Sequence, residues 1–150
     1  MNTLTEKGIN LLDEGHAEII RLFHVASMMN TDEFQECLSE METADFADVL
    51  PNISIKELSE YDKDERAELF HDRNMFGFFA RCHHYVMVDF RFREDGSFSS
   101  CSKSCAFIEF YAYGETMEEL IDKIREIDDK LFGKEVNKAR KKQGIVWEEN

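Results

Sequence analysis

Apolar residues recur at helical spacing through the first seventy residues of the chain. Ile9, Leu12, Ile19 and Phe23 follow this spacing, which predicts an amphipathic helix over residues 3–29. A second helix is predicted to begin with a capping box at Asn30 and Glu33, with its apolar face at Phe34, Cys37, Leu38 and Met41. A short third helix should run from Thr43 to Pro51, and a charged fourth from Ser54 to about Asp72.

From Phe76 onward the apolar positions alternate, as they do in a half-buried strand. The segment Glu94-Asp95-Gly96 supplies a three-residue turn, so the pattern predicts a long antiparallel hairpin with strands at about 77–93 and 97–113. Arg93 then lies opposite Ser97, and the numbers of paired residues sum to 190. Even-numbered positions are the more apolar set and should face the core. The odd-numbered face is expected to be exposed and carries Tyr85, Met87, Phe107, Tyr111 and Tyr113.

A further amphipathic helix follows the hairpin, capped by Thr116 and Glu119 and ending at Gly133. A basic tail covers residues 134–150. The expected fold class is therefore α+β: a helical N-terminal half, the hairpin, and a C-terminal helix over its apolar face, because an isolated hairpin is marginally stable. We expect a single domain over residues 1–150, made of an acidic helical part (1–74), the hairpin with its helix (75–133) and the tail.

Charge adds the strongest functional signal. The chain of 150 residues has a net charge of -14, and residues 1–80 carry 18 acidic but only 6 basic side chains. Such a field repels nucleic acid and anionic lipid, and it speeds the encounter with basic surfaces. Direct binding to nucleic acid or to a membrane is not expected.

The beginning of the chain and its cysteines point to a compartment. The first ten residues contain neither a basic leader nor an apolar run, and no segment approaches the roughly 18 apolar residues of a membrane span. We expect a soluble, cytoplasmic protein whose four cysteines are reduced.

Three cysteines and two histidines lie within residues 82–105 and suggest a zinc site at first sight. In the predicted register Cys82 and His84 face the opposite side of the hairpin from Cys101 and Cys105, whereas zinc ligands must converge on one point. Cys101 and Cys105 would also lie about 13 Å apart along a strand, which is too far for a disulfide. No metal or cofactor is predicted, although a bulge in the serine-rich segment would leave a metal at Cys101 and Cys105 open.

Catalytic constellations are equally sparse. His83 with Asp89 or Glu109, and Cys105 as nucleophile, could be drawn as a catalytic set, but the register does not make them direct neighbours. His16 lies on an apolar stripe and is expected to be a hydrogen-bonded interior histidine. No phosphate-binding loop or hydrolase motif occurs, so we expect a protein that is not an enzyme.

The remaining interpretation is a non-catalytic acidic protein that blocks a basic, nucleic-acid-binding surface of a partner protein or nuclease complex. Acidic helices space their carboxylates comparably with the phosphates of a nucleic-acid strand. The expected partner-binding residues are Glu33, Glu36, Glu40, Glu42, Asp45, Asp62, Asp64, Glu65, Glu68, Tyr85 and Tyr111.

In size and charge the chain resembles small acidic phage proteins that inhibit host defence nucleases, including anti-CRISPR proteins. This resemblance implies an inhibitor. Two alternatives stay open: an immunity or antitoxin protein, and a small metal- or cysteine-dependent hydrolase centred on the 82–105 hairpin. The aromatic strand face also suits self-association as a homodimer.

Overall fold

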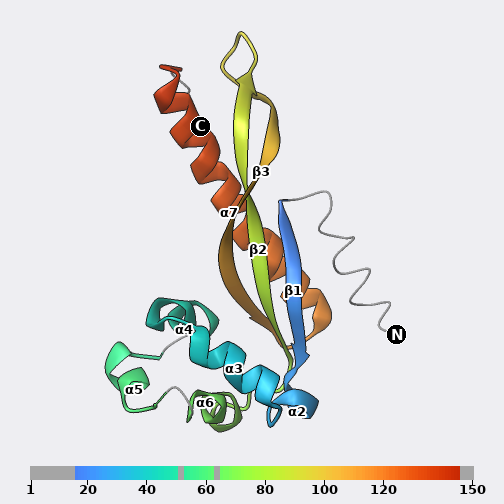
Figure 1. Cartoon of the computed structure of the whole chain (residues 1–150), viewed down its shortest axis with the longest axis vertical. Coiled ribbons are helices and arrows are strands. Elements are labelled where there is room, and N and C mark those ends of the chain that lie inside the picture. Colours follow the sequence, from blue (N-terminus) through green and yellow to red (C-terminus); the bar gives the residue numbers. More distant parts are fainter. Residues whose placement is uncertain (1–15, 51–52, 63–64, 146–150) are drawn as a thin grey trace. The chain divides into compact units, whose positions relative to one another are not determined.

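The computed structural model describes residues 16–50, 53–62 and 65–145 (Figure 1). A three-stranded sheet with the order β1-β2-β3 is formed by β1 (Ala17–His24), β2 (Phe78–Phe92) and β3 (Phe98–Gly114). Together with the helices it gives an antiparallel α+β fold, as predicted. Contacts divide the chain into two compact units. The hairpin unit comprises the described residues of 1–18, 83–109 and 125–150, and the helical unit comprises those of 19–82 and 110–124.

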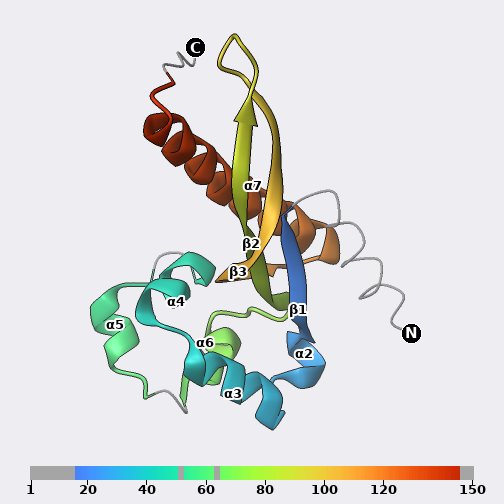
Figure 2. The same ribbon diagram turned by 45° about the horizontal axis from the view of Figure 1, so that its top comes forward.

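Five short helices belong to the helical unit. They are α2 (Val25–Met28), α3 (Asp32–Glu40), α4 (Thr43–Val49), α5 (Ile55–Ser59) and α6 (Arg66–Asp72), and Figure 2 shows α3 to α6 grouped together. Side chains cap the N-termini of α3, α4 and α5. Thr31 accepts a hydrogen bond from the Phe34 N–H, Ser54 accepts one from the Glu57 N–H, and Glu42 forms a capping box with Asp45. The predicted helix start at Ser54 is thus confirmed, whereas α3 uses Thr31 instead of Asn30.

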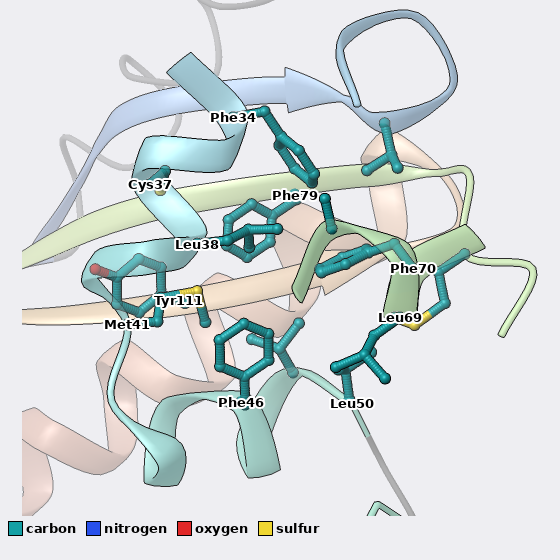
Figure 3. Close-up of a cluster of buried hydrophobic side chains, with 14 of the residues drawn as sticks. Phe34, Cys37, Leu38, Met41, Phe46, Leu50, Leu69, Phe70, Phe79 and Tyr111 are labelled. Atoms are coloured by element: carbon teal, nitrogen blue, oxygen red, sulfur yellow. The ribbon is translucent and has the colours of Figure 1, made fainter. Parts of the chain in front are cut away.

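Aromatic rings form the core of the helical unit (Figure 3). Phe34 of α3 meets Phe23, Phe70 and Phe79 edge-on, with ring centroids 5.2, 5.5 and 5.8 Å apart. Edge-to-face pairs of this kind stabilise a core beyond the burial of their area. The predicted apolar face of α3 is confirmed, because Phe34, Cys37, Leu38 and Met41 are all buried.

The predicted helix over residues 3–29 is wrong over residues 17–24, and of its described part only α2 (Val25–Met28) is helical. Residues 17–24 form the strand β1, and residues 3–15 lie outside the described residues. Ile19 and Phe23 are buried while Ile20 and His24 are exposed, so the same residues also satisfy an alternating pattern. The branched and aromatic side chains favour a strand beside β2, and this pairing overrides the helical spacing.

The predicted charged helix from Ser54 to Asp72 is two helices, α5 and α6. The segment between them, 60–65, is acidic and contains almost no apolar residue that could hold a continuous helix against a core. Helices of this length depend on packing of an apolar face rather than on intrinsic propensity. Leu58 of α5 and Leu69 and Phe70 of α6 are the residues that supply it.

The hairpin closes as the sequence predicts. The Arg93 N–H donates to the Ser97 carbonyl at 2.7 Å, and Gly96 takes the positive φ of 86° that the turn requires. Farther along, His83 stacks on Phe107 with ring centroids 3.8 Å apart, a pair whose numbers also sum to 190. Within the hairpin unit, Phe132 of α7 (Met117–Lys142) lies 6.2 Å from Phe90 and 5.2 Å from Phe98 between ring centroids, so this helix covers an apolar side of the hairpin.

Two residues of the supposedly exposed odd face, Met87 and Tyr111, are buried, which corrects that prediction. Tyr111 belongs to the core of the helical unit, where its ring stacks 5.9 Å from Phe79. In this unit Phe79 and Tyr111 on one side of the strands and Ala80 and Ala112 on the other are all buried. An alternating pattern predicts one covered face, but here both faces are covered.

Helix α7 does not end at Gly133 but continues through it to Lys142, so the predicted basic tail is the last part of this helix as far as Lys142. The Thr116 hydroxyl accepts a hydrogen bond from the Glu119 N–H at 3.1 Å, which confirms the predicted start. Glycine is a weak helix residue, not an obligatory stop, and the packing of both flanking segments holds the helix together.

Replacing Gly133 with alanine is expected to raise the free energy of unfolding by about 0.5–1 kcal/mol, because alanine loses less backbone entropy on folding. A Cβ atom at this position would meet nothing within 4 Å. Urea unfolding followed by circular dichroism measures the effect. Gly144 is the matched control: its φ is +70°, so Gly144→Ala should be destabilising by about 1 kcal/mol although its Cβ is equally unobstructed. A loss of stability in Gly133→Ala would contradict the expectation.

Candidate functional site

The acidic residues predicted to bind a partner are carried mainly by α3 and α6 of the helical unit. Glu33, Glu36 and Glu40 are exposed on α3, and Glu68 is exposed on α6. Asp62 and Glu65 are exposed just before α6, and Asp64 lies outside the described residues. Most of the predicted carboxylates are therefore at the surface of one compact unit.

Some of these carboxylates already have an internal partner. Glu33 pairs with Arg21 at 3.1 Å, and Glu40 lies 3.6 Å from the Arg81 guanidinium. Glu42 and Asp45 are used in the capping box of α4. Exposed ion pairs of this kind contribute little to stability and exchange readily with another charge, so they do not cancel the acidic surface.

Within the described residues, Glu36, Asp62, Glu65 and Glu68 make no side-chain ion pair or hydrogen bond. Glu68 also lines an open depression of about 450 Å³ between α3 and α6. This α3–α6 depression is formed by Met29, Asn30, Gln35, Ala67, Glu68, His71 and Asp72. It offers two carboxylates and two amide side chains, which are acceptors for an ammonium or guanidinium group.

Arg66 does not neutralise this surface, because its side chain is directed inward. Its residue is 8% exposed, and one Nη donates to the Met41 carbonyl at 2.6 Å. The guanidinium also lies 4.7 Å from the centroid of the Phe46 ring. The cation therefore stabilises the end of α3, and the exposed carboxylates nearby in sequence keep their charge unopposed.

The two tyrosines predicted as partner contacts do not extend this surface. Tyr111 is 4% exposed in the aromatic core, so its assignment to an exposed partner face is wrong. Tyr85 is half-buried in the hairpin unit, where its hydroxyl donates a short hydrogen bond to Glu18. The hydrogen bond to Glu18, together with burial, raises the pKa of Tyr85. The Lys103 ammonium lies 5.0 Å from the centroid of the Tyr85 ring.

A buried charged centre in the hairpin unit was missed by the sequence argument. His84 of β2 is completely buried, and its Nδ1 lies 2.6 Å from Oδ1 of Asp128 on α7. Its Nε2 lies 3.2 Å from Oε2 of Glu135, which also accepts a hydrogen bond from the Met87 N–H. The backbone N–H of His16 donates to the other oxygen of Asp128 at 2.8 Å.

Opposing effects act on the titration of this centre. Burial lowers the pKa of His84, but the hydrogen bond to Asp128 and the carboxylate of Glu135 outweigh it, so the pKa is raised. Burial lowers the pKa of His16, and the His84 charge adds to this, against the opposing effect of Asp128. His84 thus lies between two carboxylates that favour its imidazolium form. Its neighbour His16 stacks on Phe132 with ring centroids 4.1 Å apart.

A signal for this centre was present in the sequence. Asp128 follows Ile121 and Ile124 at helical spacing on the apolar face of α7, and a carboxylate at such a position needs a buried partner. His84 sits likewise among the apolar even-numbered positions of β2. His16 was expected to be an interior histidine, and it is half-buried in contact with this centre through its backbone N–H and its ring.

The residues of the hydrolase alternative are not gathered into one site. None of the four cysteines, all of which are described, forms a disulfide, and Cys82 is buried while Cys105 is exposed. His83 comes within 3.7 Å of Glu109, closer than the sequence argument expected but outside hydrogen-bond distance. Burial and the Glu135 charge raise the pKa of the Cys101 thiol, which disfavours the nucleophilic thiolate. Within the described residues no group of three or more His, Cys, Asp or Glu side chains is arranged to hold a metal ion.

A second open depression, of about 810 Å³, lies in the hairpin unit between β2, β3 and the end of α7. Its lining mixes the cationic Arg91 and Lys142 with the carboxylate of Asp89. Asp89 has a positive φ of 53°, which interrupts the regular pleat of β2. This mixed lining contrasts with the α3–α6 depression, where carboxylates are the charged groups.

None of the helices in the described part of the chain combines the length and apolar content that crossing a membrane requires. Comparison with known proteins gives no relationship: no protein-family model, no curated protein and no solved structure matches the chain.

Proposed function

We propose that this protein is a non-catalytic acidic binding protein whose helical unit occupies a basic surface of a partner protein. The partner class that fits best is a nucleic-acid-binding protein or nuclease complex, because its phosphate-binding surface is basic and accessible. The observation that supports this proposal is the set of exposed, internally unpaired carboxylates at Glu36, Asp62, Glu65 and Glu68 on one compact unit.

The inward orientation of Arg66 removes a cation from that surface and so supports the proposal. The buried hydrogen bond from Arg66 to the Met41 carbonyl uses the charge inside the unit, where it stabilises the end of a helix. A surface that served only solubility would gain from mixed charge, since like charges repel one another within a folded chain. An excess of carboxylates is instead what electrostatic steering toward a cationic partner needs.

The α3–α6 depression supplies a specific contact within the acidic surface. Its lining includes the carboxylates of Glu68 and Asp72 and the amides of Asn30 and Gln35. One lysine or arginine side chain of a partner could enter it and exchange its hydration for charge-assisted hydrogen bonds. The surrounding carboxylates would then act at longer range and accelerate association.

The test begins with affinity capture of partners from the native host and their identification by mass spectrometry. Binding of the captured partner is then measured for the wild type and for the double variant Glu36→Lys/Glu68→Lys. Reversal of two charges facing a basic surface is expected to slow association about tenfold or more at low salt. The captured partner should also lose its nucleic acid when the wild-type protein binds.

Asp122→Lys/Asp129→Lys is the matched control, because both residues are exposed on α7 and the net charge changes equally. If the control weakens binding as much as the double variant on α3 and α6, net charge and not this surface is responsible. Unchanged binding by Glu36→Lys/Glu68→Lys, with its fold verified by circular dichroism, would remove the proposal.

A further inference from the structure

Strand β3 is an outer strand of the sheet. Within the described residues β2 is its only neighbour, and from Ser99 to Glu109 every side chain is exposed or half-exposed. Phe107 is 50% exposed and Ile108 is 39% exposed. An edge strand presents unpaired backbone N–H and carbonyl groups, and a long apolar one is a ready site for pairing with another strand.

We propose that this edge pairs with β3 of a second copy of the chain, in an antiparallel arrangement that joins the two sheets. A two-fold axis makes such an interface self-complementary, so each contact occurs twice. The pairing would give the outward backbone groups of both edges a partner. The Ala106 N–H, which donates to the Ser104 hydroxyl at 3.0 Å, would exchange this hydrogen bond for one to the second copy. The pairing would also cover the exposed side chains of Phe107 and Ile108 in both copies.

The charged residues along β3 favour a second copy of the chain over another strand as the partner. The Lys103 ammonium lies over Tyr85, and the Glu109 carboxylate lies 3.7 Å from His83. Since Tyr85 and His83 are two residues apart on β2, their side chains share one face of the sheet, and Lys103 and Glu109 therefore share it too. A lysine and a glutamate on one face of an edge strand can pair with each other across a two-fold axis.

The spacing fixes the register of this pairing. Lys103 lies opposite Glu109 of the second copy only when the numbers of paired residues sum to 212, which places the two-fold axis at Ala106. Ala106 then faces its own copy, where a small side chain permits close approach. Phe107 lies opposite Cys105 of the second copy and diagonal to the second Phe107, about 7–8 Å away, within reach of an aromatic ring.

The same lysine discriminates against other occupants. A charged residue in the middle of an edge strand normally prevents pairing, because its partner strand seldom offers a matching charge. A strand without a carboxylate six residues from a lysine would leave Lys103 facing an uncharged position. A second copy of the chain has this spacing between Lys103 and Glu109. Its antiparallel pairing therefore places each lysine opposite a glutamate and forms two ion pairs.

Analytical ultracentrifugation and light scattering of the full chain test the proposal. At about 100 μM the wild type is expected to approach twice its mass of 17.6 kDa. Lys103→Glu and Glu109→Lys should each weaken dimerisation about tenfold, because each places like charges opposite one another twice. The charge-exchanged double variant Lys103→Glu/Glu109→Lys restores both pairs and should dimerise like the wild type.

This design separates pairing from net charge. Lys103→Glu makes the chain more acidic and Glu109→Lys makes it less acidic, so a general charge effect would move the two variants in opposite directions. Circular dichroism of each variant verifies folding. A wild type that stays monomeric, or a double variant that fails to recover, would overturn the proposal.

Cross-linking checks the register independently. In a Cys101→Ser/Cys105→Ser background, Ala106→Cys should form a disulfide-linked dimer under a mild oxidant, because residue 106 faces its own copy. Ser104→Cys, on the same exposed strand, is the control and should cross-link much less. Equal cross-linking of both, or of Ser104→Cys alone, would contradict an axis at Ala106.

Discussion

Replacing His84 with leucine is expected to lower the free energy of unfolding by about 3–5 kcal/mol at pH 6, because it leaves two buried carboxylates without their cation. His84 is completely buried, Asp128 is 2% exposed, and the side chain of Glu135 is 14% exposed. Removal of one partner from such a cluster exposes the remaining charges to the full cost of desolvation. Urea unfolding at pH 6 measures the loss.

The pH dependence gives the same experiment a second readout. The pKa of folded His84 is raised above its unfolded value of 6.5, so its stabilising contribution is complete below pH 6.5. This contribution is lost as the pH rises through the folded pKa. In this window the unfolded chain has already released the proton that the folded protein still binds, so a rise in pH favours the unfolded state. Wild-type stability should therefore fall in this window, and the His84→Leu variant should lack that fall.

Two variants make the interpretation specific. His84→Gln keeps an amide donor for Asp128 but no charge, so it should lose less stability than His84→Leu and should also lack the fall in stability above pH 6.5. His83→Leu changes the adjacent histidine, which lies 3.7 Å from Glu109 near the surface, and is expected to cost less than about 1 kcal/mol. Parallel pH profiles for the wild type and His84→Leu would contradict the buried imidazolium.

The features of the fold that depend on one local interaction could be predicted from the sequence. The turn at Gly96 follows from the positive φ that only glycine adopts freely, and the start of α7 follows from the Thr116 cap. The boundaries that failed depend on distant packing. Residues 17–24 satisfy both helical and alternating patterns, and pairing with β2 decides between them. Gly133 weakens a helix without ending it when both flanks are held elsewhere.

The candidate sites divide in the same way. Exposed carboxylates such as Glu36 and Glu68 could be predicted, because a helical stripe separates buried from exposed positions along one segment. The positions of His84 and Asp128 on apolar faces indicated buried polar groups, but their pairing could not be predicted, since it joins β2 to a helix more than forty residues later. The burial of Tyr111 also lay beyond the sequence, because alternation shows one apolar face and cannot reveal that helices cover the other.

Replacement of the buried Arg66 is expected to destabilise the helical unit strongly. Arg66→Ala should lower the free energy of unfolding by about 2–4 kcal/mol, because it removes a charged hydrogen bond and a cation–π contact and leaves a buried carbonyl unsatisfied. The carbonyl is that of Met41, 2.6 Å from the guanidinium, and the ring is that of Phe46. The carbonyls at this end of α3 also carry the negative end of the helix dipole.

Urea unfolding at neutral pH measures this loss of stability. Two further variants provide the comparison. Arg66→Lys keeps the charge but lacks the planar guanidinium, so an intermediate loss is expected. Arg73→Ala breaks the more accessible ion pair with Glu57 and should cost about 1 kcal/mol or less. If Arg66→Ala cost no more than Arg73→Ala, the buried cation would not hold the end of α3. A stabilising role inside the helical unit would then not explain why the Arg66 cation is absent from the acidic surface.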